Sequence, residues 1–124
     1  MARGCSARSR PLRAGSVVSN RQPRWAELWW CSFDEAGRRP VLVLTRPEAV
    51  TRLPRLLVAP ATTTVRGLPT EVHLDEDDGV PRPCVLTLDT PELVRRFRCD
   101  EFIAQLSAQR WHEVCTALST AINC

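Results

Sequence analysis

Two neighbouring arginines have the side chains best suited in this sequence to holding a phosphate. Arg38 and Arg39 stand directly before Pro40, where a polar turn leads into an apolar run. A guanidinium can bind a phosphate through two parallel hydrogen bonds, so the pair is a candidate phosphate clamp. Two solvated surface charges would have the same spacing, and the residues alone leave both interpretations open.

Two further polar clusters follow apolar runs. Thr62, Thr63 and Thr64 come shortly after Pro60, and their hydroxyls could bond phosphate oxygens or base edges. Threonine is also common in sheets, which explains the cluster without any function. Asp89 closes another apolar run, where it could orient an arginine, accept a hydrogen bond from a base, or simply form a turn.

Other kinds of site are not indicated. His73 falls on the polar side of an alternating segment, and His112 falls outside the apolar stripe of the last helix, so both are expected to be solvated. The six cysteines include no C-x-x-C pair, and we expect reduced thiols, several of them buried as small apolar groups. The acidic run 75–78 lacks the alternating ligands of a calcium loop. We therefore expect no metal and no cofactor.

Tryptophans cluster near the start of the apolar part of the chain. Trp25, Trp29 and Trp30 fall together on the first predicted strand. Because they are not spread along the chain, the pattern does not indicate a stacking platform, and part of the set must belong to the core.

The elements that position these residues are mostly strands. Apolar, β-branched and aromatic runs predict strands at 27–33, 41–45, 56–59, 70–74, 84–88 and 102–106, separated by turns at 34–37 and 66–69. The run 41–44 is apolar without alternation, which predicts a strand buried on both faces. Pro47 suits the first turn of a short helix or a loop.

The chain then changes period. Ser107 is a good N-cap, and the residues after it predict a helix with an apolar face made of Trp111, Val114, Cys115, Leu118 and Ile122. Short strands followed by a terminal helix predict an α+β fold, mainly β: a small SH3-like β-barrel with a C-terminal helix packed on it.

Composition divides the 124 residues into two parts. Residues 1–24 hold six of the 17 basic residues, all arginine, and no acid, whereas residues 25–124 hold 11 arginines against 14 Asp and Glu. The basic part predicts a disordered extension, and 25–124 predicts one domain. No run approaches the about 20 apolar residues that span a bilayer, so we expect no membrane association and a cytoplasmic protein.

Five motifs in the same order resemble the MazF/PemK family. They are Glu27-Leu28-Trp29-Trp30, Arg39-Pro40-Val41-Leu42-Val43-Leu44, Val58-Ala59-Pro60-Ala61-Thr62-Thr63-Thr64, Arg66-Gly67-Leu68-Pro69-Thr70-Glu71-Val72 and Cys84-Val85-Leu86-Thr87-Leu88-Asp89, followed by a closing strand and helix around Leu106-Ser107. The resemblance covers about residues 27–124.

This resemblance implies the CcdB/PemK-like plasmid maintenance toxin fold and a type II toxin. Such a toxin forms a homodimer, is inhibited by a cognate antitoxin, and cleaves single-stranded RNA at specific sequences without a metal. The RNA 2′-hydroxyl attacks the neighbouring phosphate and leaves a 2′,3′-cyclic phosphate. The family's catalytic positions correspond to Arg39, which would stabilise the phosphate and protonate the leaving 5′ oxygen, and to Thr62.

The resemblance also implies weaker candidates for RNA binding, namely Thr63, Thr64, Arg66, Asp89 and Glu35. Glu35 would replace the acid of a longer first loop that carries G-S-E in many relatives, because here only residues 34–38 separate the first two strands. Thr87 occupies the place of a second arginine in PemK-type members. The cut sequence, the class of RNA and the antitoxin therefore cannot be inherited from any relative.

Two alternatives remain. A CcdB-type toxin would share the fold and inhibit DNA gyrase through its terminal helix, but the tail 121–124 lacks the expected Trp-Gly-Ile-like ending. A catalytically degenerate barrel would bind RNA, with salt dependence, and leave it intact.

Overall fold

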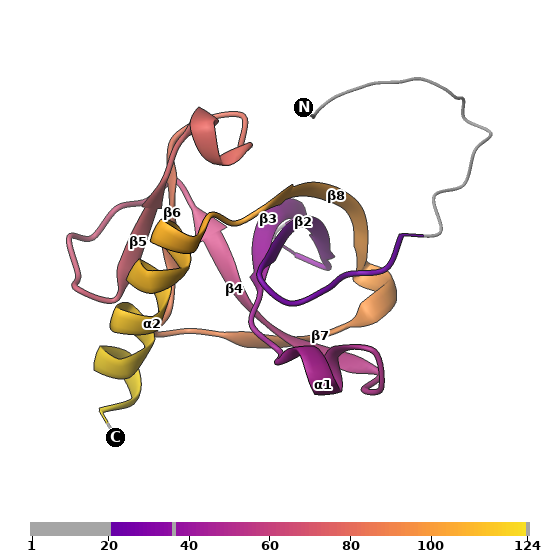
Figure 1. Cartoon of the computed structure of the whole chain (residues 1–124). Helices are drawn as coiled ribbons and strands as arrows, with labels where there is room; N and C mark the ends of the chain where they lie inside the picture. The colour runs from indigo at the N-terminus through magenta and orange to yellow at the C-terminus, as the bar shows by residue number, and fades with distance from the viewer. Residues whose placement is uncertain (1–20, 36, 124) are drawn as a thin grey trace.

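A bent antiparallel sheet with one long helix against it makes up the computed structural model, which describes residues 21–35 and 37–123 (Figure 1). The strands are β2 (Glu27–Phe33), β3 (Gly37–Val43), β4 (Arg55–Thr62), β5 (Glu71–Leu74), β6 (Cys84–Thr87), β7 (Glu92–Arg95) and β8 (Cys99–Gln105). The helices are α1 (Pro47–Val50) and α2 (Ala108–Ile122), with short 3-10 helices η1 (Glu76–Asp78) and η2 (Arg96–Arg98).

The strands follow the path β5-β6-β4-β3-β2-β8, and β7 pairs with β4 beside that path. The predicted α+β class with a terminal helix is confirmed. The predicted barrel is not closed: in the part of the chain that the structure describes, β5 and β8 end the path without pairing with each other. β5 pairs only with β6 and β8 only with β2, so no described backbone ladder joins the two ends.

β4 is the strand that joins the two parts of the sheet. Arg55–Val58 pair with β7, Ala61 and Thr62 pair with β6, and 58–60 pair with β3. Because Val58 pairs with both Val43 and Glu92, β3 and β7 lie on opposite edges of β4. Pro60, which has no N–H to donate, separates the segments that pair with β7 and with β6.

Two apolar clusters cover the two faces of the central strands. Leu28, Leu42 and Ala59 belong to the cluster next to α2, whereas Trp29, Val41 and Val58 belong to the other. Neighbouring residues of β2, β3 and β4 thus point into different clusters, as strand alternation requires. The predicted burial of 41–44 on both faces is confirmed, with Val41, Leu42 and Val43 fully buried.

α2 lies along β5 at one end of the sheet (Figure 1). The Ser107 side chain accepts from the Arg110 N–H, which confirms the predicted N-cap. The predicted apolar face is only partly right. Val114 is buried and Trp111 and Leu118 pack on the core, but Cys115 and Ile122 are exposed, and Ala117 packs instead. The face of α2 that packs on the core is therefore narrower than the predicted apolar face.

Several strand boundaries differ from the prediction. β3 begins at Gly37 rather than near Val41, so Arg38 and Arg39 are strand residues paired with Ser32 and Cys31 and not residues of a leading turn. β7 was not predicted, because its sequence ELVR buries only Val94 and shows no apolar run. The segment is a strand because its backbone pairs with β4.

Residues 21–24 lie against the start of the sheet. Pro23 is buried, and Arg21 forms an ion pair with Glu27 at 2.9 Å. The same carboxylate, 3% exposed, accepts from the Arg24 N–H and from the Trp29 indole N–H. Residues 21–24 therefore pack against the domain. The rest of the predicted extension, residues 1–20, lies outside the described residues.

Cysteine and histidine environments match the prediction where they are described. Cys31, Cys84 and Cys99 are buried free thiols, and Cys115 is an exposed one. Cys5 and Cys124 lie outside the described residues. His73 and His112 are exposed. Neither α1 nor α2 combines the length and the apolar character that crossing a membrane requires.

The loop before β6 touches β8 at a glycine. Gly79 has φ +101°, and a Cβ there would stand 2.9 Å from the Ala104 Cβ. Arg110 of α2 anchors the same loop from the other side through its ion pair with Asp78 at 3.2 Å. These two contacts together hold the backbone just before the segment 80–83.

Replacing Gly79 by Ala should destabilise the fold through both backbone strain and the contact with Ala104. Gly67→Ala is a matched control, because Gly67 has φ +72° and a Cβ added there would meet nothing within 4 Å. We expect a loss of about 1 kcal/mol for Gly67→Ala and about 2–4 kcal/mol for Gly79→Ala in urea denaturation. Equal losses for both variants would show that the Ala104 contact has no effect.

Candidate functional site

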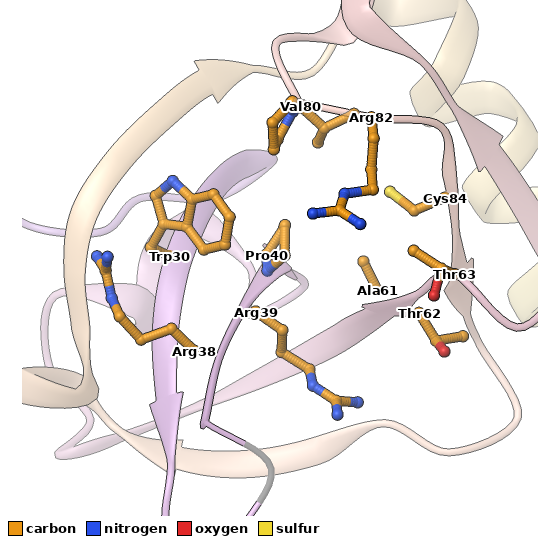
Figure 2. A pocket seen from close by; sticks show the side chains of 11 residues that line it. Trp30, Arg38, Arg39, Pro40, Ala61, Thr62, Thr63, Val80, Arg82 and Cys84 are labelled. Atoms are coloured by element: carbon orange, nitrogen blue, oxygen red, sulfur yellow. The ribbon is translucent and has the colours of Figure 1, made fainter.

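A pocket of about 260 Å³ opens where β3 begins and β4 ends (Figure 2). It is lined by residues of β2, β3, β4 and the segment that leads into β6. They are Trp30, Arg38, Arg39, Pro40, Ala61, Thr62, Thr63, Val80, Pro81, Arg82 and Cys84. The lining holds three guanidiniums and no carboxylate, so the pocket favours an anion.

Arg39 and Thr62 face each other across the β3–β4 pair. The last paired residues are Val41 and Pro60, and continuing that register by two residues sets Arg39 opposite Thr62 on the same face. Figure 2 shows the Arg39 guanidinium pointing toward the end of β4 that carries Thr62. The structure therefore brings together the two residues predicted to be catalytic.

Thr62 is oriented by the turn that follows it. Its Oγ1 accepts from the Thr64 backbone N–H at 3.1 Å, the local bond by which a threonine ends a strand. This bond uses one lone pair and leaves the hydroxyl proton available. Thr62 can thus donate a hydrogen bond to an anion in the pocket, and Thr63, next to it, adds a second hydroxyl on the lining.

The two neighbouring arginines have different surroundings. Arg38 forms ion pairs with Asp100 at 2.8 Å and Glu101 at 3.0 Å, and these hydrogen bonds raise the pKa of its guanidinium further. Arg39 lies half-buried over the Phe33 ring at 5.7 Å. Among residues 21–35 and 37–123, no acid pairs with it. Of the two arginines in the predicted clamp, only Arg39 has no acidic partner among the described residues, so its charge is available to bind a ligand.

The rest of the lining is mainly apolar. It includes Trp30, Pro40, Ala61, Val80 and the buried thiol of Cys84. Burial, followed by the nearby Asp78 charge, raises the pKa of that thiol. Since a thiol reacts as its thiolate, the raised pKa makes Cys84 a poor nucleophile at neutral pH.

Four of the predicted RNA-binding residues do not line this pocket. Glu35 is exposed in the β2–β3 turn, and the Thr64 side chain is exposed beyond it. Asp89 accepts a hydrogen bond from the buried Thr70 hydroxyl. Arg66 lies in a loop closed by Glu71.

That loop is held by a single carboxylate. Glu71 accepts from the N–H groups of Arg66, Gly67 and Leu68 at 2.9–3.3 Å. These bonds, that of Arg66 first, lower the pKa of the Glu71 carboxyl. Thr87, at the family's second arginine position, donates its hydroxyl to the Pro60 carbonyl at 3.1 Å and is likewise outside the pocket. RNA binding by the four residues stays a prediction.

Two lining residues were missed from the sequence. Trp30 was grouped with Trp29 as a strand aromatic, but Trp29 is buried and Trp30 is only half-buried. Alternation along β2 could have separated them. Arg82 reaches the pocket from the segment before β6, and no local pattern marks such a contact. In the described residues we find no group of three His, Cys, Asp or Glu side chains placed to hold a metal.

Known proteins with similar sequences support one family. Residues 24–122 match the family model of the PemK-like, MazF-like toxins of type II toxin–antitoxin systems. The probable endoribonuclease MazF5 of Mycobacterium tuberculosis is 45% identical over 82% of this chain and 94% of its own length. The probable endoribonuclease MazF2 of the same species is 36% identical over 82% of this chain and 99% of its own length.

Solved structures agree with the sequence comparisons. The Mycobacterium tuberculosis toxin MazF-mt6 has a TM-score of 0.73 at 33% identity, covering 78% of this chain and 96% of that one. A MazE–MazF structure from Deinococcus radiodurans has a TM-score of 0.70 at 29% identity, covering 83% and 97%. Together with the antiparallel sheet and the terminal helix, these matches show that the chain belongs to the PemK-like, MazF-like toxin family.

Proposed function

We propose that this protein is a toxin that cleaves single-stranded RNA at specific sequences, without a metal, by attack of the RNA 2′-hydroxyl on the neighbouring phosphate. The observation that carries the proposal is the pocket that Arg39 and Thr62 line together, where the pairing of β3 and β4 stops, with no acid of the described residues paired to Arg39. The relatives MazF5 and MazF2 are described as probable endoribonucleases, which supports RNA as the substrate.

The nucleophile in this reaction belongs to the substrate. The 2′-oxygen forms a bond to phosphorus, the bond from phosphorus to the 5′ oxygen breaks, and a 2′,3′-cyclic phosphate and a 5′-hydroxyl result. The protein must stabilise a phosphorane that carries more negative charge than the ground state, and it must supply a proton to the leaving oxygen. A site without a side-chain nucleophile can therefore be complete.

Arg39 and Thr62 fit these needs. The Arg39 guanidinium would bind two oxygens of the phosphate and stabilise the added charge, and an N–H directed at the 5′ oxygen would assist its departure. The Thr62 hydroxyl would donate to the same phosphate. Because both donors are already in place before RNA binds, they need little reorganisation in the transition state.

We infer two protein partners on the same basis. The family is defined by toxin–antitoxin systems, and a similar structure from Deinococcus radiodurans contains MazE with MazF, which supports a cognate antitoxin as inhibitor. We also propose a homodimer, as the family resemblance implies. We place the activity in the cytoplasm, where single-stranded RNA is available.

Arg39→Ala should abolish cleavage. We would incubate long mixed-sequence RNA transcripts with the purified protein in excess EDTA, and map the ends. Wild type should cut at few sites and leave 2′,3′-cyclic phosphates, and Arg39→Ala should be at least about 100-fold slower, because it lacks the main charge stabilising the transition state. Arg55→Ala is the control, since Arg55 is exposed at the other end of β4, seven residues and about 23 Å from Thr62 at about 3.3 Å per residue.

Intact RNA with wild-type protein would overturn the enzyme proposal. RNA retained without cleavage would then indicate a binding protein, and the next assay would be DNA gyrase inhibition. Cleavage that depends on an added divalent ion and stops in EDTA would overturn the metal-independent mechanism alone.

Thr62→Val tests the hydroxyl separately. Valine keeps the shape of the side chain and removes the donor, so we expect kcat to fall by about 10²–10³, the loss seen when one transition-state donor is removed. Thr62→Ser keeps both the donor and the bond to the Thr64 N–H, so it should stay within about tenfold of wild type. Equal activity of the Val and Ser variants would assign Thr62 a purely structural role.

A further inference from the structure

The apolar wall of the pocket has no part in the chemistry assigned to Arg39 and Thr62. Trp30 pairs with Pro40 across β2 and β3, on the sheet face that carries the Leu28–Leu42 pair. Arg39 is next to Pro40 in the strand and therefore points to the other face. The pocket thus joins a charged side and an apolar side at the open end of the β3–β4 pair.

Trp30 offers an aromatic surface that is held in place. Its strand neighbours Trp29 and Cys31 are 2% and 0% exposed, whereas Trp30 is only half-buried and lines the pocket. The Arg38 guanidinium lies over its ring at 5.3 Å and is itself fixed by Asp100 and Glu101. In Figure 2 Arg38 points past Trp30, away from the Arg39 guanidinium.

Arg82 brings a second charge to the pocket from a different wall. Figure 2 shows its guanidinium directed into the pocket. It has no ion pair or side-chain hydrogen bond with the rest of the described chain, 21–35 and 37–123. Pro81 and Pro83 restrict the backbone on either side of it, and Gly79 packs the preceding loop on β8. The backbone that carries the Arg82 side chain is therefore restrained.

We infer that this pocket is the binding subsite for one nucleotide next to the cleaved bond, with the base stacked on Trp30 and the flanking phosphate bound by Arg82. A base needs an apolar, aromatic surface, and the phosphate attached to its sugar needs a cation a short distance away. The pocket supplies both within one cavity of about 260 Å³, the scale of a single nucleotide rather than of a protein segment.

The position of the pocket decides which nucleotide it takes. Arg39 belongs to the same lining, so an occupant of the apolar side is covalently adjacent to the phosphate held by Arg39 and Thr62. Unstacked bases of single-stranded RNA are commonly bound by stacking on an aromatic side chain. The Thr63 hydroxyl on the same lining could bond the base edge, which would give the subsite a preference among bases. This inference rests on the proposed ribonuclease function.

The stacking contact can be tested by removing either partner. An oligonucleotide that the wild type cuts would be resynthesised with an abasic residue at each position flanking the cut in turn. At one adjacent position we expect kcat/KM for the wild type to fall about tenfold or more, the loss typical of one base–aromatic stack. Trp30→Leu should show that loss on the intact oligonucleotide and no further loss at that abasic position. Trp30→Phe should restore most of the activity.

Independent effects would overturn this subsite. If the losses from Trp30→Leu and from the abasic residue multiply at every position, Trp30 does not contact a base. Trp30→Leu retains an apolar side chain, and its thermal unfolding would be compared with that of wild type. Phe97→Ala is the control, because Phe97 is an aromatic residue 72% exposed outside this pocket.

The phosphate contact has its own readout. Binding of the same oligonucleotide, with the 2′-hydroxyl at the cut replaced by hydrogen, would be measured at several salt concentrations. Arg82→Ala should reduce the slope of log K against log salt by about 0.7, the value for one phosphate contact on a single strand, whereas Arg82→Lys and Arg55→Ala should leave the slope unchanged. An unchanged slope for Arg82→Ala would remove Arg82 from the subsite.

The two proposals fail in different ways. If the wild type cuts no RNA in EDTA, the ribonuclease function is wrong. If the wild type cuts RNA while the Trp30 and Arg82 variants behave like their controls, the ribonuclease function stands and the nucleotide subsite is wrong.

Discussion

The pairing of β4 with three other strands is the constraint on which the site depends. β7 pairs with residues 55–58 of β4, β3 pairs with 58–60, and β6 pairs with Ala61 and Thr62. Because β3 stops pairing at Pro60 while β6 continues to Thr62, the β3 and β4 chains separate at their open end. That separation creates the pocket, and it leaves Arg39 and Thr62 facing each other without a backbone ladder between them.

Strand alternation then assigns different roles to adjacent arginines. Arg38 and Arg39 are consecutive in β3 and point to different faces. Arg38 meets Asp100 and Glu101 at the start of β8 and becomes part of the scaffold, where its guanidinium also covers the Trp30 ring. Arg39 meets no acid in the described chain and keeps an uncompensated charge beside Thr62. The two arginines look equivalent in the sequence, but they have different partners because successive side chains of a strand point to opposite faces.

The sequence was sufficient for the parts of the fold that local pattern controls. The apolar run at 41–44, the Ser107 cap and the order of motifs around Arg39 and Thr62 each depend on a few neighbouring residues. The parts that failed depend on distant partners. β7 is extended because it pairs with β4 rather than because of its own ELVR sequence, and the predicted barrel is open because β5 and β8 do not pair in the described chain. Trp30 and Arg82 enter the pocket only once β2 and the segment before β6 are placed in space.

The same alternation separates the residues proposed for catalysis from those proposed for base binding. Arg39 and Thr62 share one face of the β3–β4 pair, whereas Trp30, Pro40 and Ala61 belong to the other. A substitution on the apolar side would change the proposed base contact without moving the groups proposed to act on the phosphate. A substitution in the segment that carries Arg82 would change the proposed phosphate contact without altering either face of the sheet. The proposed chemistry and the proposed base preference could therefore change independently, because the two sets of residues are positioned by different strands and loops.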